Sequence, residues 1–204
     1  MTSPKYMMIT VAKCPPGKVG EAKGHLDGLC SDLKSGAGAA TTRHGMIATG
    51  EHTGQIILFQ TYDELNGIDR AFGVYESSAS YKGLIHDVKV SVTLRNIMRI
   101  EDLGLANPSS DQPEYGVVTR GISADLQLDN MRACVPHFDA GGAMILRYCT
   151  ILTGPAAGHR LIVAGYPSMD AIQSTYDNLG GSPEYNKVLE TFEVEWRNII
   201  RVMG

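Results

Sequence analysis

The spacing of apolar residues predicts a strand and then an amphipathic helix at the start of the chain. Residues 6–13 are a short, mostly apolar stretch of β-favouring residues, which the Pro15–Gly17 segment ends. Apolar residues then recur three and four positions apart, on one face of a helix: Val19, Ala22, Leu26, Leu29 and Leu33. Gly36 and Gly38 are expected to end this helix, because glycine suits the left-handed position after a helix.

Two strands, a second helix and a last strand follow. The strands are expected near residues 44–49 and 55–62, with a hairpin loop at 50–54 between them. The second helix carries an apolar stripe made of Leu65, Ile68, Phe72 and Tyr75. After the segment from Ser78 to Tyr81, a strand over 90–100 ends the half. The resulting order is β-α-β-β-α-β, the split unit of ferredoxin-like folds.

The second half of the chain repeats the first. Residues 92–100 (VTLRNIMRI) return as residues 194–202 (VEWRNIIRV), at an offset of 102 (197 − 95). A middle block matches at an offset of 104 (147 − 43) and a first block at 109 (115 − 6). Because the three blocks keep their order, they indicate a tandem duplication. We expect a first repeat at 1–100, a polar linker at 101–114 and a second repeat at 115–204.

The repeated unit, with the segment Ser182–Tyr185 before the last strand, resembles the dimeric α/β-barrel superfamily in its fused form. The resemblance covers nearly the whole chain and is greatest to the antibiotic-biosynthesis-monooxygenase-like domains. It implies an α+β fold in which two tandem ferredoxin-like units cover each other, sheet against sheet, as an intramolecular dimeric α/β barrel. A fold does not determine a function, so the resemblance leaves several activities open.

Composition and charge exclude several classes of protein. A formal charge of −4 and a hydrophobic content of 43% are typical of a globular chain with a packed core and no nucleic-acid partner. No apolar run reaches the length of a membrane span and no signal peptide is recognised, so we expect a cytoplasmic protein without a membrane partner. The cysteines lie far apart and the histidines lack ligand spacing, which predicts reduced thiols, no metal site and no cofactor.

The two last strands carry the strongest candidate chemistry. One set of alternating positions is apolar apart from a single asparagine in each strand, and we expect it to lie under the helices. The opposite set, expected to face the barrel interior or its mouths, carries Arg95, Arg99, Arg197 and Arg201. These arginines could hold a carboxylate or similar anion, or form an ion-pair network with partners such as Glu193 and Glu195. Arg43 and Arg147 are open to the same two interpretations.

Polar and aromatic residues near the expected clefts give further candidates. Asn96 and Asn198 could each bind a substrate oxygen in a cleft between sheet and helices, or bond to loop backbone and fix the fold. Trp196, which replaces Leu94 in the repeat, could stack on a flat ligand or belong to the core.

Tyrosines and histidines complete the set of candidates. Four tyrosines occupy matching places in the halves, at strand ends and before the last strands: Tyr62, Tyr166, Tyr81 and Tyr185. Their hydroxyls could donate a hydrogen bond or a proton in a cleft, or lie at the surface above packed rings. His44 on a strand and His137 on a helix are the best candidates for a general base or a haem ligand, against an ordinary polar role.

Three functions remain open. The first is a small-molecule-binding protein that is a cofactor-independent monooxygenase-like enzyme acting on a small hydrophobic or aromatic substrate. Its catalytic candidates are His44, Tyr62, Asn96, His137, Tyr166 and Asn198. Its substrate-binding candidates are Tyr81, Arg95, Tyr185, Trp196 and Arg197. The second is a non-catalytic ligand-binding or stress-associated structural protein, and the third a haem protein. We expect a monomer with an internal pseudo-dimer, or a homodimer.

Differences between the halves predict unequal clefts beneath the two helix layers. The connection between the first helix and the next strand spans 13 residues in the first half (43 − 30) and 8 in the second (147 − 139). The longer connection could act as a lid. Phe192 and Trp196 add aromatic bulk to the second half. We therefore expect the larger cleft in the first half.

Overall fold

The computed structural model of the chain describes residues 3–204, and its two halves share one order of elements. The first half contains β1 (Tyr6–Lys13), α1 (Val19–Ala37), β2 (Thr41–Ile47), β3 (Ile56–Tyr62), α2 (Leu65–Ser77), α3 (Ala79–His86) and β4 (Ser91–Glu101). The second half contains β5 (Tyr115–Ile122), α4 (Leu128–Ala140), β6 (Ile145–Ile151), β7 (Arg160–Tyr166), α5 (Met169–Gly180), α6 (Pro183–Leu189) and β8 (Glu193–Val202). The predicted order is confirmed, with one short helix added before each last strand.

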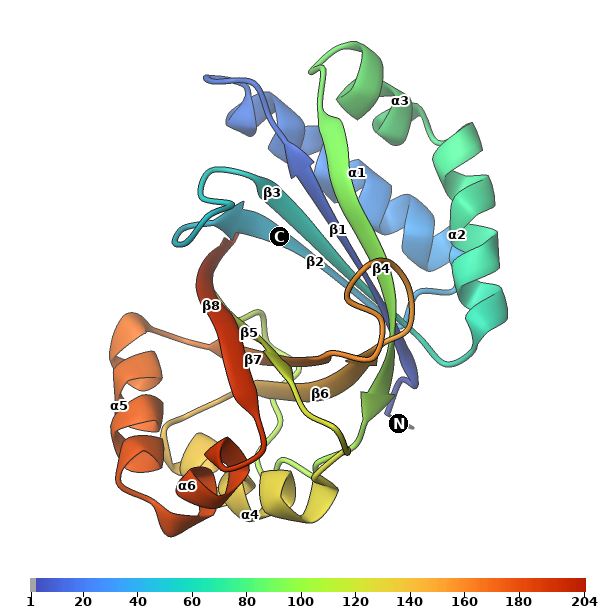
Figure 1. Cartoon of the computed structure of the whole chain (residues 1–204). Helices are drawn as coiled ribbons and strands as arrows, with labels where there is room; N and C mark the ends of the chain where they lie inside the picture. The colour runs from blue at the N-terminus through green and yellow to red at the C-terminus, as the bar shows by residue number, and fades with distance from the viewer. Residues whose placement is uncertain (1–2) are drawn as a thin grey trace.

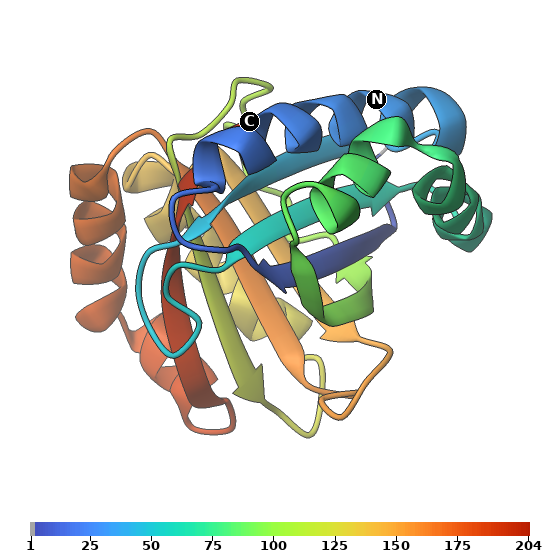
Figure 2. The ribbon, with the colours of Figure 1, turned by 90° about the horizontal axis from the view of Figure 1, so that it is seen from above.

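The strands close into one antiparallel barrel in the order β1-β3-β2-β8-β5-β7-β6-β4, and β4 pairs back onto β1. The two halves join twice, where β2 pairs with β8 and where β4 pairs with β6. The helices of each half lie outside its own strands (Figures 1 and 2). The fold is the predicted one, two tandem ferredoxin-like units that form an intramolecular dimeric α/β barrel.

Three apolar clusters fill the space between these layers. One lies between α1–α3 and the strands of the first half, and a second lies between α4–α6 and the strands of the second. The third lies in the barrel interior and combines residues from both halves, among them Met7, Ile9, Met98, Val118, Leu161 and Ile200. Each sheet is thus covered on both faces. None of the described helices is long and apolar enough to cross a membrane.

The long connection predicted after the first helix does not exist. Gly36 lies inside α1, which continues to Ala37 because the buried stripe extends through Leu33 to that residue. Gly38 ends the helix in the left-handed conformation, with φ of 70°. Only residues 38–40 connect α1 to β2, so the first half has no lid at this place.

In the last strand of each half, a bulge near the start changes the face of the sheet to which the side chains point. β1 pairs Val11 with Leu94 and Ala12 with Val92, which leaves Thr93 as an extra residue in β4. The pairing of β5 with β8 has the same irregularity. An extra residue turns every side chain beyond it to the opposite face of the sheet.

The bulge overturns part of the prediction about the last strands. Before it, Val90 and Phe192 pack under the helices, as expected. Beyond it, the set that carries the asparagines faces the barrel interior instead: Leu94, Asn96, Met98, Trp196, Asn198 and Ile200. Arg95 and Arg197 belong to the alternate set and face the helices, so the prediction that they face the barrel interior was wrong.

These two arginines pack on aromatic rings instead of joining an ion-pair network. The guanidinium carbon of Arg95 lies 4.2 Å from the ring centre of Tyr75 in α2, and that of Arg197 lies 4.0 Å from the ring centre of Tyr176 in α5. Their Nε atoms donate to threonine hydroxyls of the neighbouring strands, at 3.1 and 3.0 Å. Glu195, an expected partner, pairs with Arg120 instead.

Candidate functional site

A cavity of about 490 Å³ opens at one end of the barrel interior. All strands contribute to its wall, and its deeper part is apolar. The buried apolar residues that line it include Ile9, Ile47, Met98, Val118, Ile151 and Ile200. A cavity of this volume is in the range that holds small organic ligands.

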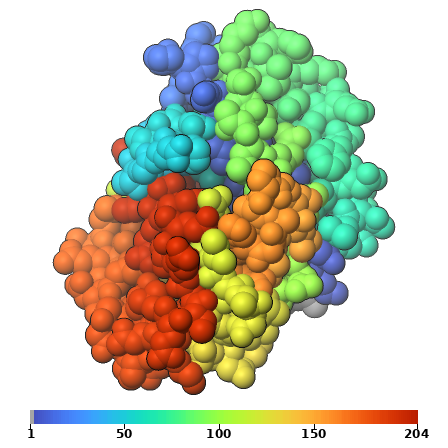
Figure 3. Space-filling view, viewed as in Figure 1, coloured from blue at the N-terminus to red at the C-terminus, as the bar shows by residue number. Residues whose placement is uncertain are grey.

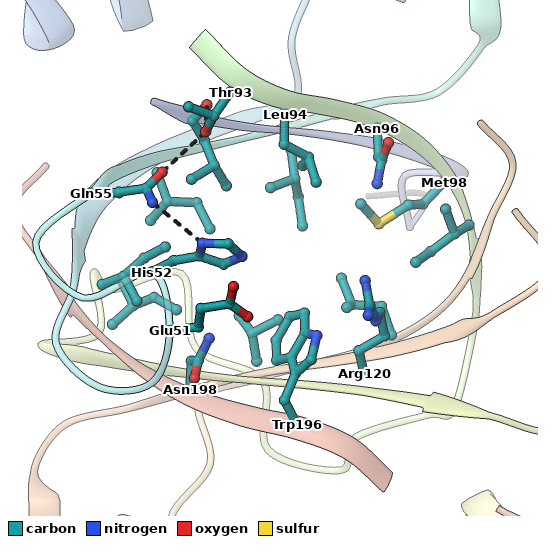
Figure 4. A pocket seen from close by; sticks show the side chains of 18 of the residues that line it. Glu51, His52, Gln55, Thr93, Leu94, Asn96, Met98, Arg120, Trp196 and Asn198 are labelled. Carbon is teal, nitrogen blue, oxygen red and sulfur yellow. Dashed lines mark hydrogen bonds between the residues drawn. The ribbon is translucent and has the colours of Figure 1, made fainter. Parts of the chain in front are cut away.

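The hairpin that joins β2 to β3 brings polar side chains to the cavity mouth (Figure 4). Glu51, His52 and Gln55 line the cavity from this hairpin, next to Lys13 and Thr93 at the bulged ends of β1 and β4. The Oε1 atom of Gln55 accepts a hydrogen bond from the Thr93 hydroxyl at 3.0 Å, and its Nε2 atom lies 3.3 Å from Nδ1 of His52. These contacts orient the imidazole so that Nε2 of His52 faces the cavity.

The opposite side of the mouth consists of Arg120 from β5 and Trp196 from β8 (Figure 4). The guanidinium carbon of Arg120 lies 5.2 Å from the ring centre of Trp196, within range of a cation–π contact. Its Nε and Nη2 atoms donate to the two carboxylate oxygens of Glu195, at 2.8 and 3.2 Å. Although partial burial opposes the effect, hydrogen bonds from His159 and Arg120 lower the pKa of Glu195. The charged carboxylate therefore holds the guanidinium beside the indole.

Asn96 and Asn198 lie between the cavity and the hairpins. With its amide nitrogen turned toward the hairpin, Asn96 donates to the Thr153 carbonyl oxygen at 3.2 Å, and Asn198 donates to that of Thr49 at 3.1 Å. In this orientation the carbonyl oxygen of each amide occupies the position that points into the cavity in Figure 4. The backbone contacts support a role in fixing the fold, and the two oxygens are placed to accept hydrogen bonds from a ligand.

The same contacts explain the Thr-Gly pair that both halves share. Gly50 and Gly154 have φ of 82° and 83°, in the left-handed region that glycine tolerates best. A Cβ atom at Gly50 would lie 1.9 Å from the end of the Asn198 amide that faces the hairpin, and one at Gly154 would lie 2.7 Å from the corresponding end of Asn96. Any larger residue would displace the asparagine that each hairpin covers.

The two halves differ at the cavity mouth. At the offsets of the repeat, His52 corresponds to Ala156 (156 − 52 = 104) and Val11 corresponds to Arg120 (120 − 11 = 109). Trp196 corresponds to Leu94 (196 − 94 = 102). A polar or aromatic side chain from one half thus faces a small or apolar one from the other.

Three of the predicted site residues line this cavity: Asn96, Asn198 and Trp196. The predicted tyrosines lie in the layers between sheet and helices. The hydroxyl of Tyr62 is buried and donates to Oε1 of Gln60 at 2.7 Å, and Tyr166 is fully buried. Tyr81 packs on Tyr75 in the same layer as Arg95, with ring centres 4.8 Å apart. In the second half, the hydroxyl of Tyr185 accepts a hydrogen bond from Nη2 of Arg197 at 3.1 Å.

The two predicted histidines do not reach the cavity either. His44 is buried, and its Nε2 atom lies 2.7 Å from a carboxylate oxygen of Asp27 in α1. Nε2 of His137 in α4 lies 3.4 Å from a carboxylate oxygen of Glu184 in α6. Both pair with acidic residues on helices, which favours the ordinary polar role.

Sequence reasoning missed the mouth residues His52, Gln55 and Arg120. His52 and Gln55 lie in or beside a loop, where periodicity gives no information about direction. The available signal was the repeat itself. Its matched blocks place a histidine opposite an alanine and an arginine opposite a valine, so the two halves present different chemistry at these positions.

The clefts expected beneath the helix layers are almost closed. The space beside Tyr81 and Arg95 in the first half has a volume of about 30 Å³, and the space beside Tyr185 and Arg197 in the second has about 20 Å³. Each volume is of the order of one water molecule. The expected larger cleft under the first helix layer was therefore wrong, because the bulges turn the asparagines and Trp196 into the barrel interior that both halves share.

Comparison with solved structures shows the same fold along the full chain. A candidate monooxygenase from Lactobacillus acidophilus NCFM is 10% identical with a TM-score of 0.63, over 98% of this chain and 94% of that one. A candidate monooxygenase from Fusobacterium nucleatum is 11% identical with a TM-score of 0.66, over 100% and 94%. A variant of chlorite dismutase from Candidatus Nitrospira defluvii is 8% identical with a TM-score of 0.63, over 100% and 93%. At these identities the likeness concerns the fold alone.

Comparison of sequences places the chain in a family. No curated protein matches it significantly. A family model described as a domain of unknown function (DUF6854) matches residues 4–100 and again residues 113–202. Since these two matches together cover most of the chain, the protein belongs to the DUF6854 family.

Proposed function

We propose that the protein binds a small, flat, mostly apolar molecule in the barrel cavity, with the polar end of the molecule at the mouth. The observation that carries this proposal is the division of the cavity. Its deep part is apolar, and its mouth has His52 and Lys13 on one side and Trp196 and Arg120 on the other. Specific ligand sites combine an apolar lining with a few placed polar groups in this way.

The form of the ligand follows from the mouth residues. Trp196 offers an aromatic face, and the stack with Arg120 orients that face, so a planar ring is the best complement. The hydrogen-bonding groups there include donors and acceptors: the imidazole of His52, the ammonium of Lys13 and the carbonyl oxygens of both asparagines. A hydroxyl or carboxylate on the ring could form a hydrogen bond with one of these groups.

The experiment is calorimetric titration with naphthoate, a flat apolar probe with one polar group. Trp196→Leu, which copies Leu94 of the first half, should weaken binding about tenfold because it removes the aromatic face. Phe72→Leu, at an exposed position on α2 outside the barrel, should leave the affinity unchanged. Equal affinities of wild type and Trp196→Leu, or no binding of naphthoate or naphthol, would contradict the proposal.

A catalytic function is the second candidate, and the position of His52 at the cavity mouth favours it. Its Nε2 atom faces the cavity. There it could accept the proton of a ring hydroxyl and leave an electron-rich phenolate, which reacts with oxygen without a cofactor. For a naphthol, one oxygen atom of O₂ would enter the ring and the other would leave as water. The ring is oxidised to a naphthoquinone, so atoms and electrons balance.

Oxygen uptake in the presence of a naphthol, with quinone absorbance as the second readout, tests this function. His52→Gln should lower the rate about a hundredfold. His86→Gln, an exposed position on α3, should not change it. If naphthol binds but no oxygen is consumed, the binding proposal stands as a non-catalytic function and the enzymatic one fails.

The described residues that line the cavity do not fit haem as the ligand. A haem iron needs an axial side chain, most often histidine, that reaches into the pocket. His44 and His137, the two expected to serve, pair with carboxylates outside the cavity. Among the described residues that line the cavity, the one histidine is His52, which is at the mouth and is held by Gln55. We therefore derive no chemistry through haem.

A further inference from the structure

The end of the barrel interior opposite the cavity mouth holds two arginines that line the same small space. Arg43 on β2 and Arg147 on β6 are half-buried and line one space of about 60 Å³. They occupy matching positions of the repeat (147 − 43 = 104), so the pseudo-twofold axis of the barrel passes between them. Among residues 3–204, the rest of the lining includes Thr41 and Thr61 and contains no acidic residue.

Neither arginine has a counter-charge within residues 3–204. Arg43 forms no side-chain hydrogen bond and no ion pair there, and Nη1 of Arg147 donates only to the Leu146 carbonyl oxygen, at 3.3 Å. Burial is the main cause that lowers the pKa of Arg43, and the positive charge of Arg147 lowers it further. Other arginines of this chain bind carboxylates, as Arg99 does with Glu101 at 2.7 Å. Two half-buried like charges without a partner are unfavourable unless an anion joins them.

We propose that Arg43 and Arg147 form a second binding site, for a small oxyanion on the pseudo-twofold axis of the barrel. A guanidinium group presents a planar fork of donors that matches two oxygens of a carboxylate or phosphate. Two forks related by a twofold axis match an anion that is itself twofold symmetric, as inorganic phosphate, sulfate and a carboxylate group are.

The surroundings favour an anion over a larger ligand. The space of about 60 Å³ holds a group of a few atoms, whereas the cavity at the other end has about 490 Å³. The Thr41 and Thr61 hydroxyls lie 2.7 Å apart, so one of them keeps a proton that it can donate to a bound oxyanion. The site is separate from the proposed ligand cavity and does not depend on what that cavity binds.

Thermal unfolding with added anions tests the site. Phosphate should raise the Tm of the wild type by about 5–10 °C at 100 times its Kd, relative to chloride at the same ionic strength. Acetate in place of phosphate tests a carboxylate as the natural group. Arg43→Gln and Arg147→Gln should each lose most of this increase and weaken phosphate binding at least tenfold by calorimetry. Arg70→Gln, which changes an exposed arginine on α2, should keep the full increase in Tm.

A second readout separates anion binding from a structural role. In chloride alone, Arg43→Gln should be at least as stable as the wild type, because one of two repelling charges is gone. If neither phosphate nor acetate stabilises more than chloride, or if both glutamine variants keep the increase, the proposal fails. Should a glutamine variant not fold, Arg43→Lys keeps the charge but loses the planar fork, and an undiminished increase in that variant would contradict the site.

Discussion

His44 illustrates how surroundings decide the role of a single residue. Its side chain is fully buried, with Nε2 held by Asp27 of α1 and Nδ1 without a partner in residues 3–204. Its backbone N–H donates to the Gly204 carbonyl oxygen at 2.6 Å, and its carbonyl oxygen accepts from Met203 at 2.9 Å. One residue thus joins helix α1, strand β2 and the segment after β8, which is a structural position.

This burial makes the stability of the protein depend on pH. Burial lowers the pKa of His44, and the contact with Asp27 opposes this only in part. The unfolded chain therefore takes up a proton near pH 6.5 that the folded protein does not, and the free energy of unfolding falls as the pH drops below that value. Despite partial burial, hydrogen bonds from Lys23 and His44 lower the pKa of Asp27. The contribution of Asp27 to the free energy of unfolding is therefore lost only at more acidic pH.

Urea unfolding at about pH 7.5 and pH 5.5 measures the effect, which is at most about 1.4 kcal/mol per pH unit for one proton. His44→Gln should reduce the difference between the two conditions, and His86→Gln should preserve it. An equal pH dependence in His44→Gln would show that another group is responsible.

At the scale of elements, each hairpin completes the last strand of the other half. Ala48 N–H donates to the Ile199 carbonyl oxygen and Ile199 N–H donates to the Thr49 hydroxyl, both at 2.8 Å. The hairpin of the second half bonds to β4 in the same way, through Thr153 and Ile97 at 2.9 Å. In Figure 3 the cyan hairpin accordingly lies against the red β8, and the orange hairpin lies against the green β4.

Thr49→Val should therefore destabilise the fold more than a change elsewhere in the hairpin. Valine has the shape of threonine but removes the hydrogen bond to the Ile199 N–H, which contributes about 0.5–1.5 kcal/mol. Thr53→Val is the matched control, since within residues 3–204 that hydroxyl bonds only inside the hairpin, to the Gly50 carbonyl oxygen. Chemical denaturation should rank the two variants in this order, and equal losses would mean that the contact between halves contributes nothing.

The elements could be predicted from the sequence, but the face of the last strands could not. The helical stripes and the repeat gave the element order, and residues 6–13 match β1 fully. The bulge at Thr93 carries no glycine or proline to mark it, yet it exchanges the two faces of the strand beyond it. The asparagines and Trp196 were therefore recognised as candidates but assigned to the wrong space, and the arginines to the wrong side.

At the scale of the whole molecule, the barrel interior belongs to neither half alone. Both junctions between the halves are strand pairs, and the interior cluster mixes residues of the two repeats. Separating the halves would expose two strand edges in each half, together with the apolar inner face of its sheet. We therefore expect the halves to unfold together.

Coincident unfolding curves would verify this expectation. Trp196, the one tryptophan of the chain, reports on the second half and the cavity, and far-UV circular dichroism reports on both halves. A single urea midpoint by both signals is expected for a two-state transition. Tryptophan fluorescence that changes at lower urea than the circular dichroism would mean that the second half opens on its own.

The difference between the two sides of the cavity mouth also decides how many orientations a bound ligand can adopt. In a homodimer, a pocket on the twofold axis offers every asymmetric guest two equivalent poses, related by half a turn. Here half a turn would exchange His52 for Ala156 and Trp196 for Leu94, so the two poses have different energies. Fusion of the repeats into one chain removes the degeneracy. A reaction at His52 would then meet one edge of the ring and give a single regioisomer.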